Sequence, residues 1–382
     1  MDEREGGTPW RLPRNAFAPV LADELVHCSE VMYGLPAPLD ITHRMRERTS
    51  AMPPADVTML PKEFLRDSTP DIHPGAVQAD DAFVAFAHRT GIARCEQDVK
   101  KLRSFAFGVF TGWCYPTLPQ ARLDLLTQWH YWLTITDDVA DATDRGGPGE
   151  AIRLCNSIQR AIKTAAPVTG GGPAAVSVHD LWHRTAPAQS PQWCQRARVD
   201  LALYLRQYVE QRHNRELHLR LAPDEYQRLR RDSVGLDFNT DVLEAVHAIQ
   251  VPEPLFATWQ LRELRNCFVD ANSWFNDYYS FDREVRSGEQ HNLALVLAGH
   301  EGIDHDTALA RVLDMIQERL QQFLTLERLL LETLRALGYG AGTITEVGRY
   351  TRALRDYTYG HVAWSSTSSR YNEHQLRATT WA

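Results

Sequence analysis

Four aspartates stand directly after an apolar run in "WLTITDDVADATD", residues 132–144. Asp137, Asp138 and Asp141 form a DDxxD pattern, and positions i and i+4 lie on one face of a helix about 6 Å apart along its axis. Two carboxylates placed in this way can share hard cations. Mg²⁺ suits them because it prefers oxygen ligands at about 2.1 Å and commonly combines one or two carboxylates with water and phosphate oxygens. A solvated helix end is the alternative explanation for this pattern taken alone.

A second set of oxygen ligands stands in "NDYYSFDRE". Asn276, Ser280 and Glu284 recur at i, i+4 and i+8, so an amide oxygen, a hydroxyl and a carboxylate share one helix face and suit a further Mg²⁺. Arg283 stands beside Glu284, where it can meet an anion. A plain polar helix face is the alternative. The preceding run "CFVDANSWF" is too apolar for a fully solvated helix, however, so polar ligands that face a core indicate a site.

Together the two motifs resemble the aspartate-rich and NSE (NDxxSxxxE) motifs of class I terpene synthases of the bacterial type. Arg230 in "LRRDS" lies 46 residues before Asn276, where that family has its diphosphate-sensing arginine. Arg370 and Tyr371 match the family's C-terminal RY pair, and Trp364 precedes the pair as the family's tryptophan commonly does. All of these landmarks occur in the order that the family shows.

The resemblance covers roughly residues 57–372 and implies a fold and a ligand set. The implied fold is all-α: a single-domain class I terpenoid synthase bundle with a central apolar cavity and the two motifs on facing helices at its mouth. A prenyl diphosphate would be the substrate, and three Mg²⁺ ions, for which Mn²⁺ can substitute, would be the cofactor. The implied Mg²⁺ ligands are Asp137, Asn276, Ser280 and Glu284, with Asp138 and Asp141 as outer or occasional ligands. The implied hydrogen-bond donors to diphosphate are Arg230, Arg283, Arg370 and Tyr371.

The cavity wall should be apolar and aromatic, because a desolvated cation over an aromatic face gains up to about 2 kcal/mol. Candidates for the wall are Trp113, Trp274, Phe275 and Trp364, each of which could instead be ordinary core. Trp364 is the preferred one.

Two further segments bear on the shape of the pocket. Ser233 and Val234 follow Arg230 by three and four positions, where the family has a helix-break linker and an effector carbonyl. The match is looser at Val234, because the family often has glycine there. Before DDxxD the family often has aromatic residues, whereas this chain has "LTIT", beginning at Leu133, so its pocket should differ.

This chemistry explains why aspartates follow a core segment. An allylic diphosphate ionises only if the departing charge is held, and metals with fixed donors supply several kcal/mol of that stabilisation in a dry site. We therefore predict a terpene synthase that ionises farnesyl diphosphate and forms a cyclic terpene. Geranyl, methylated geranyl and geranylgeranyl diphosphate are alternative substrates. A chain-elongating prenyltransferase would need a second aspartate-rich motif, and a non-catalytic helical interaction protein would scatter these ligands.

The elements that position the motifs are predicted to be helices. Ser190 and Pro191 open one with Val199, Leu203, Tyr204 and Tyr208 on its apolar face; another runs from Pro254 to Gly288; a third ends at Gly338; and a fourth covers about 343–361. No convincing alternating strand is present. The glycine-rich stretch 165–176 reads as a loop between helices. Residues 1–56 are a proline-rich extension with at most a short helix near 23–33, and residues 57–382 form the catalytic domain.

Composition narrows the possible partners. The chain is 43% hydrophobic and 24% charged with a formal net charge of -8, so it lacks the basic footprint of a nucleic-acid-binding protein. It has no run near the roughly 18 apolar residues of a membrane span and no signal-peptide h-region, which predicts a cytoplasmic protein without stable membrane association. A monomer or homodimer is expected. Six scattered cysteines without a CxxC pair are expected to be reduced and mostly buried.

Overall fold

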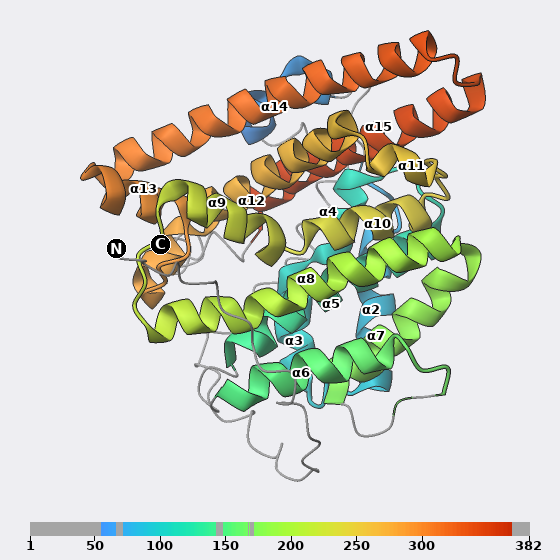
Figure 1. The fold of residues 1–382 in the computed structure, drawn as a ribbon. Helices are drawn as coiled ribbons and strands as arrows, with labels where there is room; N and C mark the ends of the chain where they lie inside the picture. Colours follow the sequence, from blue (N-terminus) through green and yellow to red (C-terminus); the bar gives the residue numbers. More distant parts are fainter. Residues whose placement is uncertain (1–54, 66–71, 143–147, 167, 169–171, 369–382) are drawn as a thin grey trace, which may run out of the picture. The chain divides into compact units, whose positions relative to one another are not determined.

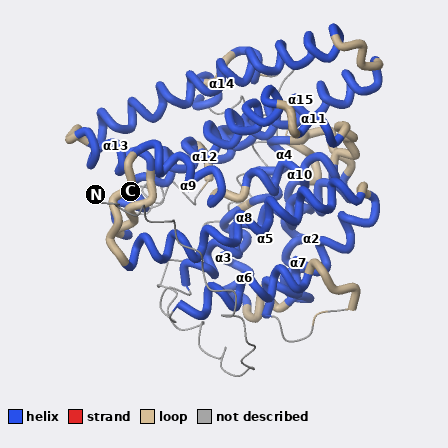
Figure 2. The backbone as a smooth tube through the Cα atoms, viewed as in Figure 1, coloured by secondary structure: helices blue, strands red, loops and turns tan. Residues whose placement is uncertain are grey.

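The computed structural model describes residues 55–65, 72–142, 148–166, 168 and 172–368, and within these ranges Figure 2 shows helices and loops and no strand. The all-α prediction is confirmed. The described α-helices are α2 (Ala76–Thr90), α3 (Glu96–Phe105), α4 (Phe107–Cys114), α5 (Gln120–Ala142), α6 (Pro148–Ala161), α7 (Gly172–Thr185), α8 (Pro191–Glu216), α9 (Pro223–Ser233), α10 (Leu236–Val246), α11 (Glu253–Phe256), α12 (Trp259–Ser287), α13 (Leu293–Glu301), α14 (His305–Ala336) and α15 (Ala341–Ser365). Short 3₁₀ helices are η1 (Ala55–Met59), η2 (Lys62–Phe64) and η4 (Ala186–Ala188).

The described helices belong to one compact unit, Asp40–Ala382. Nearly all of the predicted extension 1–56 lies outside the described residues, as does the short helix near 23–33. None of the described helices is long and apolar enough to cross a membrane. All five described cysteines are free, and Cys114, Cys155 and Cys267 are buried.

Capping residues set the ends of the long helices. Ser190 accepts a hydrogen bond from the Trp193 amide at 3.0 Å and Pro191 is the first residue of α8, as predicted. Gly288 closes α12 with a φ of 74°, a left-handed conformation that favours glycine. These helix ends are confirmed because each is a local interaction that the sequence reveals.

Two details of the predicted helices are wrong. The helix expected from Pro254 to Gly288 is interrupted at Thr258, which has an extended backbone and caps the separate helix α12, so the first turn belongs to α11. Val199 is 51% exposed and does not belong to the apolar face of α8. It lies two positions from both Ala197 and Leu201, which are fully buried, and two positions turn a helix by about 200°.

The two helices that carry the motifs lie inside the bundle. Helix α12 contacts α9, α13, α14 and α15, and α5 contacts α2, α4, α7 and α10 (Figure 1). Leu126 and Trp129 of α5, and Leu264 and Phe268 of α12, are at most 1% exposed. Complete burial of a large apolar side chain contributes about 1.5–3 kcal/mol, so both helices are firmly held.

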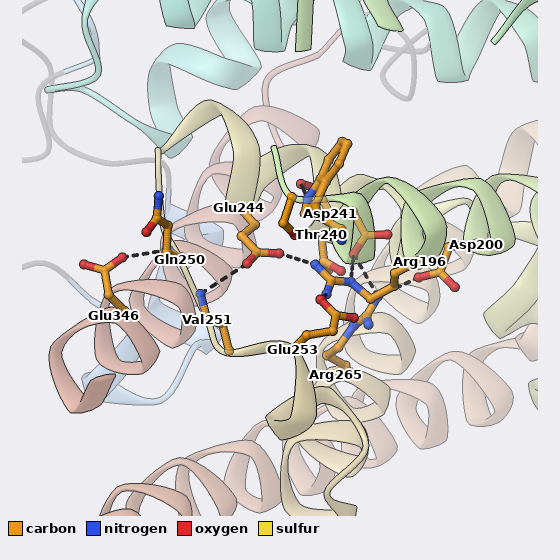
Figure 3. A network of polar contacts seen from close by, with 12 residues as sticks. Arg196, Asp200, Thr240, Asp241, Glu244, Gln250, Val251, Glu253, Arg265 and Glu346 are labelled. Atoms are coloured by element: carbon orange, nitrogen blue, oxygen red, sulfur yellow. Dashed lines mark hydrogen bonds and ion pairs between the residues drawn. The ribbon is translucent and has the colours of Figure 1, made fainter. Parts of the chain in front are cut away.

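A buried ion network joins α8, α10, α11 and α12 (Figure 3). The guanidinium of Arg196 bonds Asp241 at 2.8 Å and also bonds Glu244 and Glu253, while it stacks on Phe256 at 3.6 Å from the ring centroid. Burial raises the pKa of Glu244 to about 7 even though Arg196 opposes this shift. The arginine therefore compensates carboxylates that would otherwise be costly to bury.

Arg265 extends this network from the first turns of α12. One of its Nη atoms lies 3.0 Å from Asp200 of α8 and donates to the Asp237 carbonyl of α10 at 3.1 Å. The N-terminal end of α12 is thus tied to both neighbouring helices.

We predict that Arg196→Met lowers the free energy of unfolding by about 3–5 kcal/mol, because it leaves buried carboxylates without their partner. The matched control is Arg228→Met, which breaks an exposed pair with Asp224 and should cost at most about 1 kcal/mol. Urea unfolding followed by circular dichroism measures both. Equal losses in the two variants would contradict a stabilising role for the network.

Candidate active site

A cavity of about 460 Å³ opens among α4, α5, α8, α9, α10, α12 and α15. Five residues that the sequence singled out for metal or diphosphate binding line it together: Asp137, Arg230, Asn276, Arg283 and Glu284. They come from three helices, so only the fold brings them into one place.

Aromatic and apolar side chains form much of the cavity wall. Trp364 stacks on Phe107 with ring centroids 5.1 Å apart and an interplanar angle of 25°, and it lies 5.4 Å from Phe110. Its indole Nε1 donates to the Phe105 carbonyl at 3.1 Å, which fixes the ring. Leu133, Val234 and Trp364, three of the predicted pocket residues, are among the residues that line the cavity.

Three other aromatic candidates are not among the lining residues. Trp274 is 2% exposed and Phe275 is fully buried in the core, while Trp113 is half-buried beside it. Trp274 stands two positions from both Asn272 and Asn276, which do line the cavity. Two positions turn the helix by about 200°, so its indole points away from that face.

Arg230 crosses from α9 to α12 and holds two neighbouring side chains. It donates to Asn276 Oδ1 at 2.8 Å and to Asp277 Oδ1 at 3.0 Å. Asp277 is 1% exposed and also accepts from the Tyr226 hydroxyl at 2.7 Å and from the Leu293 amide at 3.0 Å. Burial raises the pKa of Asp277 to about 6, against the opposing effect of Arg230. A cation at Asn276 Oδ1 would share that oxygen with Arg230.

The far end of the NSE motif is also held by hydrogen bonds. Glu284 accepts from the Arg283 guanidinium at 3.1 Å and from the side-chain Nδ2 of Asn292 at 2.8 Å. Ser280 is fully buried, is not among the lining residues, and donates its proton to the Asn276 carbonyl at 2.7 Å. The Ser280 hydroxyl oxygen could still bind a cation through its lone pairs.

Other predicted residues fall where the structure describes no side chains. Asp137 is half-buried in the cavity wall, but the side chains of Asp138 and Asp141 are outside the described part, and so are Arg370 and Tyr371 altogether. Within the described ranges no three or more His, Cys, Asp or Glu side chains are grouped to hold a metal. The predicted set instead combines carboxylates with amide and hydroxyl oxygens, all hard donors, and this chemistry fits Mg²⁺.

Arg215, Glu289 and His291 form a charged cluster at the cavity that the sequence motifs did not predict. Glu289 accepts from the His291 amide at 2.9 Å and ring at 3.1 Å, and it lies 3.7 Å from Arg215. Burial opposes its ionisation, but the hydrogen bonds from His291 outweigh this and lower the pKa of Glu289 to about 2. Glu289, His291 and Arg215 all line the cavity. They form no recognisable sequence motif, because Arg215 comes from α8 and the other two come from the loop after α12.

The break between α9 and α10 lies beside the cavity. Val234 ends α9 in a helical conformation, and Gly235 has a φ of 71°. A Cβ at Gly235 would stand 2.9 Å from the Tyr204 ring, so glycine is required for both its backbone and its space. The glycine that the family often has at the position of Val234 is found here one residue later, at Gly235. Tyr204 in turn donates to the Leu133 carbonyl at 3.0 Å and connects the break to α5.

Comparison with known proteins identifies a family whose model describes a metal-binding domain. Residues 128–322 match the family model described as terpene synthase family 2, C-terminal metal binding. Pentalenene synthase of Streptomyces arenae is 26% identical over 301 residues, which cover 78% of this chain and 89% of that protein. R-linalool synthase of Streptomyces clavuligerus is 26% identical over 310 residues, which cover 81% of this chain and 93% of that protein.

Solved structures resemble the fold over most of its length. A variant of cucumene synthase superimposes with a TM-score of 0.70 at 25% identity and covers 80% of this chain and 99% of its own. The linalool/nerolidol synthase of Streptomyces clavuligerus has a TM-score of 0.70 at 25% identity, with 77% and 97% covered. The matched family segment spans half of the chain and contains Asp137, Arg230 and the NSE motif. The chain therefore belongs to terpene synthase family 2 and is a class I terpene synthase of the bacterial type.

Proposed function

We propose that this terpene synthase ionises farnesyl diphosphate with the help of Mg²⁺ and converts the resulting allylic cation into a cyclic terpene, with release of diphosphate. The observation that carries the proposal is one cavity with two different ends. Asp137, Asn276 and Glu284 line it with Arg230 and Arg283, which together form its charged end, and a cluster of aromatic rings, Phe107, Phe110, Tyr357 and Trp364, lines another part.

The charged end suits a diphosphate despite the acidic chain. Arg230 is only 16% exposed, and Asp277 keeps it charged and oriented, so the anion would meet a donor that needs no reorganisation. Arg283 is 36% exposed and offers a second donor. When bound, Mg²⁺ would supply Lewis-acid stabilisation of the departing diphosphate, with Asp137, Asn276, Ser280 and Glu284 as its proposed ligands.

The aromatic end suits a carbocation. Phe107, Phe110, Tyr357 and Trp364 line the cavity, and an aromatic ring whose face meets a cation stabilises the positive charge without adding to it covalently. Leu133 and Val234 complete this apolar part of the wall and help to exclude water.

The cavity is large enough for a small-molecule substrate. Small-molecule sites span about 300–1,000 Å³, and this cavity has about 460 Å³. Farnesyl diphosphate is the proposed substrate, and geranyl, methylated geranyl and geranylgeranyl diphosphate are the alternatives. Incubation with each substrate, followed by gas chromatography and mass spectrometry, identifies the one that is converted.

Glu284→Gln should lower the rate of diphosphate release about 100-fold or more at saturating Mg²⁺, because it removes a charged ligand whose contribution is several kcal/mol. Asp282→Asn is the matched control: Asp282 is an exposed residue of the same helix two positions away, and it does not line the cavity. It should keep nearly the wild-type rate. A fully active Glu284→Gln enzyme would remove Glu284 from the proposed metal site.

Arg230→Lys should lower the turnover of farnesyl diphosphate about 10- to 150-fold even at saturating Mg²⁺. Lysine cannot reproduce the planar guanidinium, and a hydrogen bond to a charged group contributes about 1.5–3 kcal/mol. The control Arg228→Lys changes an exposed residue of the same helix. Similar rates in both variants would show that Arg230 does not bind the diphosphate.

A further inference from the structure

Two buried histidines line the cavity beside its aromatic residues. His130 of α5 is 4% exposed and His361 of α15 is 7% exposed. Both pack on Phe110, at centroid distances of 4.8 and 6.2 Å, and both pack on Tyr357, at 5.9 and 6.1 Å. The imidazoles are thus set among the same aromatic rings that would surround a carbocation.

The hydrogen-bond pattern determines the tautomer of His130. The Thr111 hydroxyl donates its single proton to the Phe107 carbonyl at 2.8 Å. With the hydroxyl proton on that carbonyl, Thr111 accepts and Nδ1–H donates at the 2.9 Å contact with His130. Nε2 of the neutral ring then carries a lone pair; the atom is itself buried and has no hydrogen-bond partner among the described residues.

A longer chain of hydrogen bonds determines the tautomer of His361. The Thr358 hydroxyl donates to the Leu354 carbonyl at 3.1 Å, so it accepts from Asn272 Nδ2 at 2.9 Å. Asn272 Nδ2 also donates to the Phe268 carbonyl at 2.9 Å, which fixes the orientation of the amide. Asn272 Oδ1 is therefore the acceptor at 3.1 Å from His361 Nδ1, and Nε2 of this ring also keeps its lone pair.

Both rings are neutral at pH 7. Burial lowers the pKa of His130 to about 3 and that of His361 to about 4. Packing alone does not account for His130, because an apolar ring would fill the same space without burying a nitrogen that lacks a partner among the described residues.

We propose that His130 and His361 are the proton acceptors of the step that ends the reaction. The Nε2 lone pair takes a proton from the carbon next to the cationic centre, the electrons of the broken C–H bond form the new C=C bond, and the ring becomes an imidazolium. This inference rests on the proposed function and makes an olefin, formed by proton loss, the main product. The position of the two rings would select which proton is lost.

The energetics of this step are favourable even for weak bases. A C–H bond beside a carbocation is far more acidic than an imidazolium, so lowered basicity does not prevent the transfer. It helps afterwards, because a buried imidazolium readily gives its proton to the diphosphate or to water when the cavity opens. Thr111 and Asn272 act as positioning residues, since they keep Nδ1 protonated and Nε2 available.

The test compares His130→Phe, His361→Phe and the double variant with the wild-type enzyme, using farnesyl diphosphate and Mg²⁺. Ionisation depends on the charged end, so the product distribution, rather than the rate of diphosphate release, is the readout. The ratio of the main olefin to all other products should fall by at least about tenfold in the double variant, which is modest beside the 10²–10⁴-fold effect of a general base. An unchanged ratio in the double variant overturns the proposal.

A matched control separates this role from packing. His247 is half-buried, its pKa is lowered to about 4 by burial, and its Nε2 lacks a partner among the described residues. It packs edge-on against Tyr115 at 4.4 Å and does not line the cavity. His247→Phe should keep the wild-type product ratio; a shift as large as that of the double variant would assign the effect to packing and overturn the proposal.

Two further measurements keep the proposal testable if a phenylalanine variant does not fold. Thr111→Val retains His130 but removes the acceptor of its Nδ1–H, and it should also lower the share of the main olefin. Nitrogen-15 NMR of histidine-labelled wild-type enzyme should show both rings as the Nδ1–H tautomer at pH 7, and an imidazolium or the opposite tautomer overturns the proposal. Wild-type enzyme that converts no prenyl diphosphate is a different failure, that of the proposed function itself.

Discussion

The buried carboxylate of Asp277 is the constraint on which the rest of the site depends. It accepts from Arg230 of α9, from Tyr226 of α9 and from the backbone of α13, so a single α12 side chain fixes the positions of two neighbouring helices. An isolated buried carboxylate is costly, and this one is compensated by a guanidinium that points at Asn276. The ion pair therefore serves folding and places a cationic donor beside a proposed metal ligand.

One face of α12 passes from the charged end of the cavity to its aromatic part. Asn272, Asn276, Ser280 and Glu284 follow one another at intervals of four, so the NSE motif continues one turn further along the same face. Glu284 and Asn276 belong with the arginines, whereas Asn272 orients His361 among aromatic rings. A single helix can in this way position the groups that hold the leaving anion and a group that receives the final proton. The separation matters because a base beside the bond that ionises would lie next to the metal ions rather than next to the carbocation that loses the proton.

Much of the fold and the candidate site was predictable from local patterns. Ser190, Pro191 and Gly288 mark helix ends through interactions within a few residues. The DDxxD and NSE spacings predict metal ligands because they place oxygen-bearing side chains on one face of a helix. What could not be predicted depends on contacts between distant segments. Trp274 is of a residue type expected in an aromatic wall, but it faces the core. Thr258 interrupts a helix that the apolar residues on either side of it would otherwise continue. His130 and His361 are 231 positions apart in the sequence, and only the packing of α4, α5 and α15 brings them to the same rings.

The central claim is that the cavity's charged end binds diphosphate and Mg²⁺ together. Calorimetric titration of inorganic diphosphate into the wild-type protein, with and without Mg²⁺, tests it most directly because no catalytic turnover is involved. We expect strong binding with Mg²⁺, much weaker binding after the metal is chelated, and loss of binding in Glu284→Gln and Arg230→Lys but not in Asp282→Asn. Binding that is equally strong without Mg²⁺, or that survives in both site variants, would contradict it.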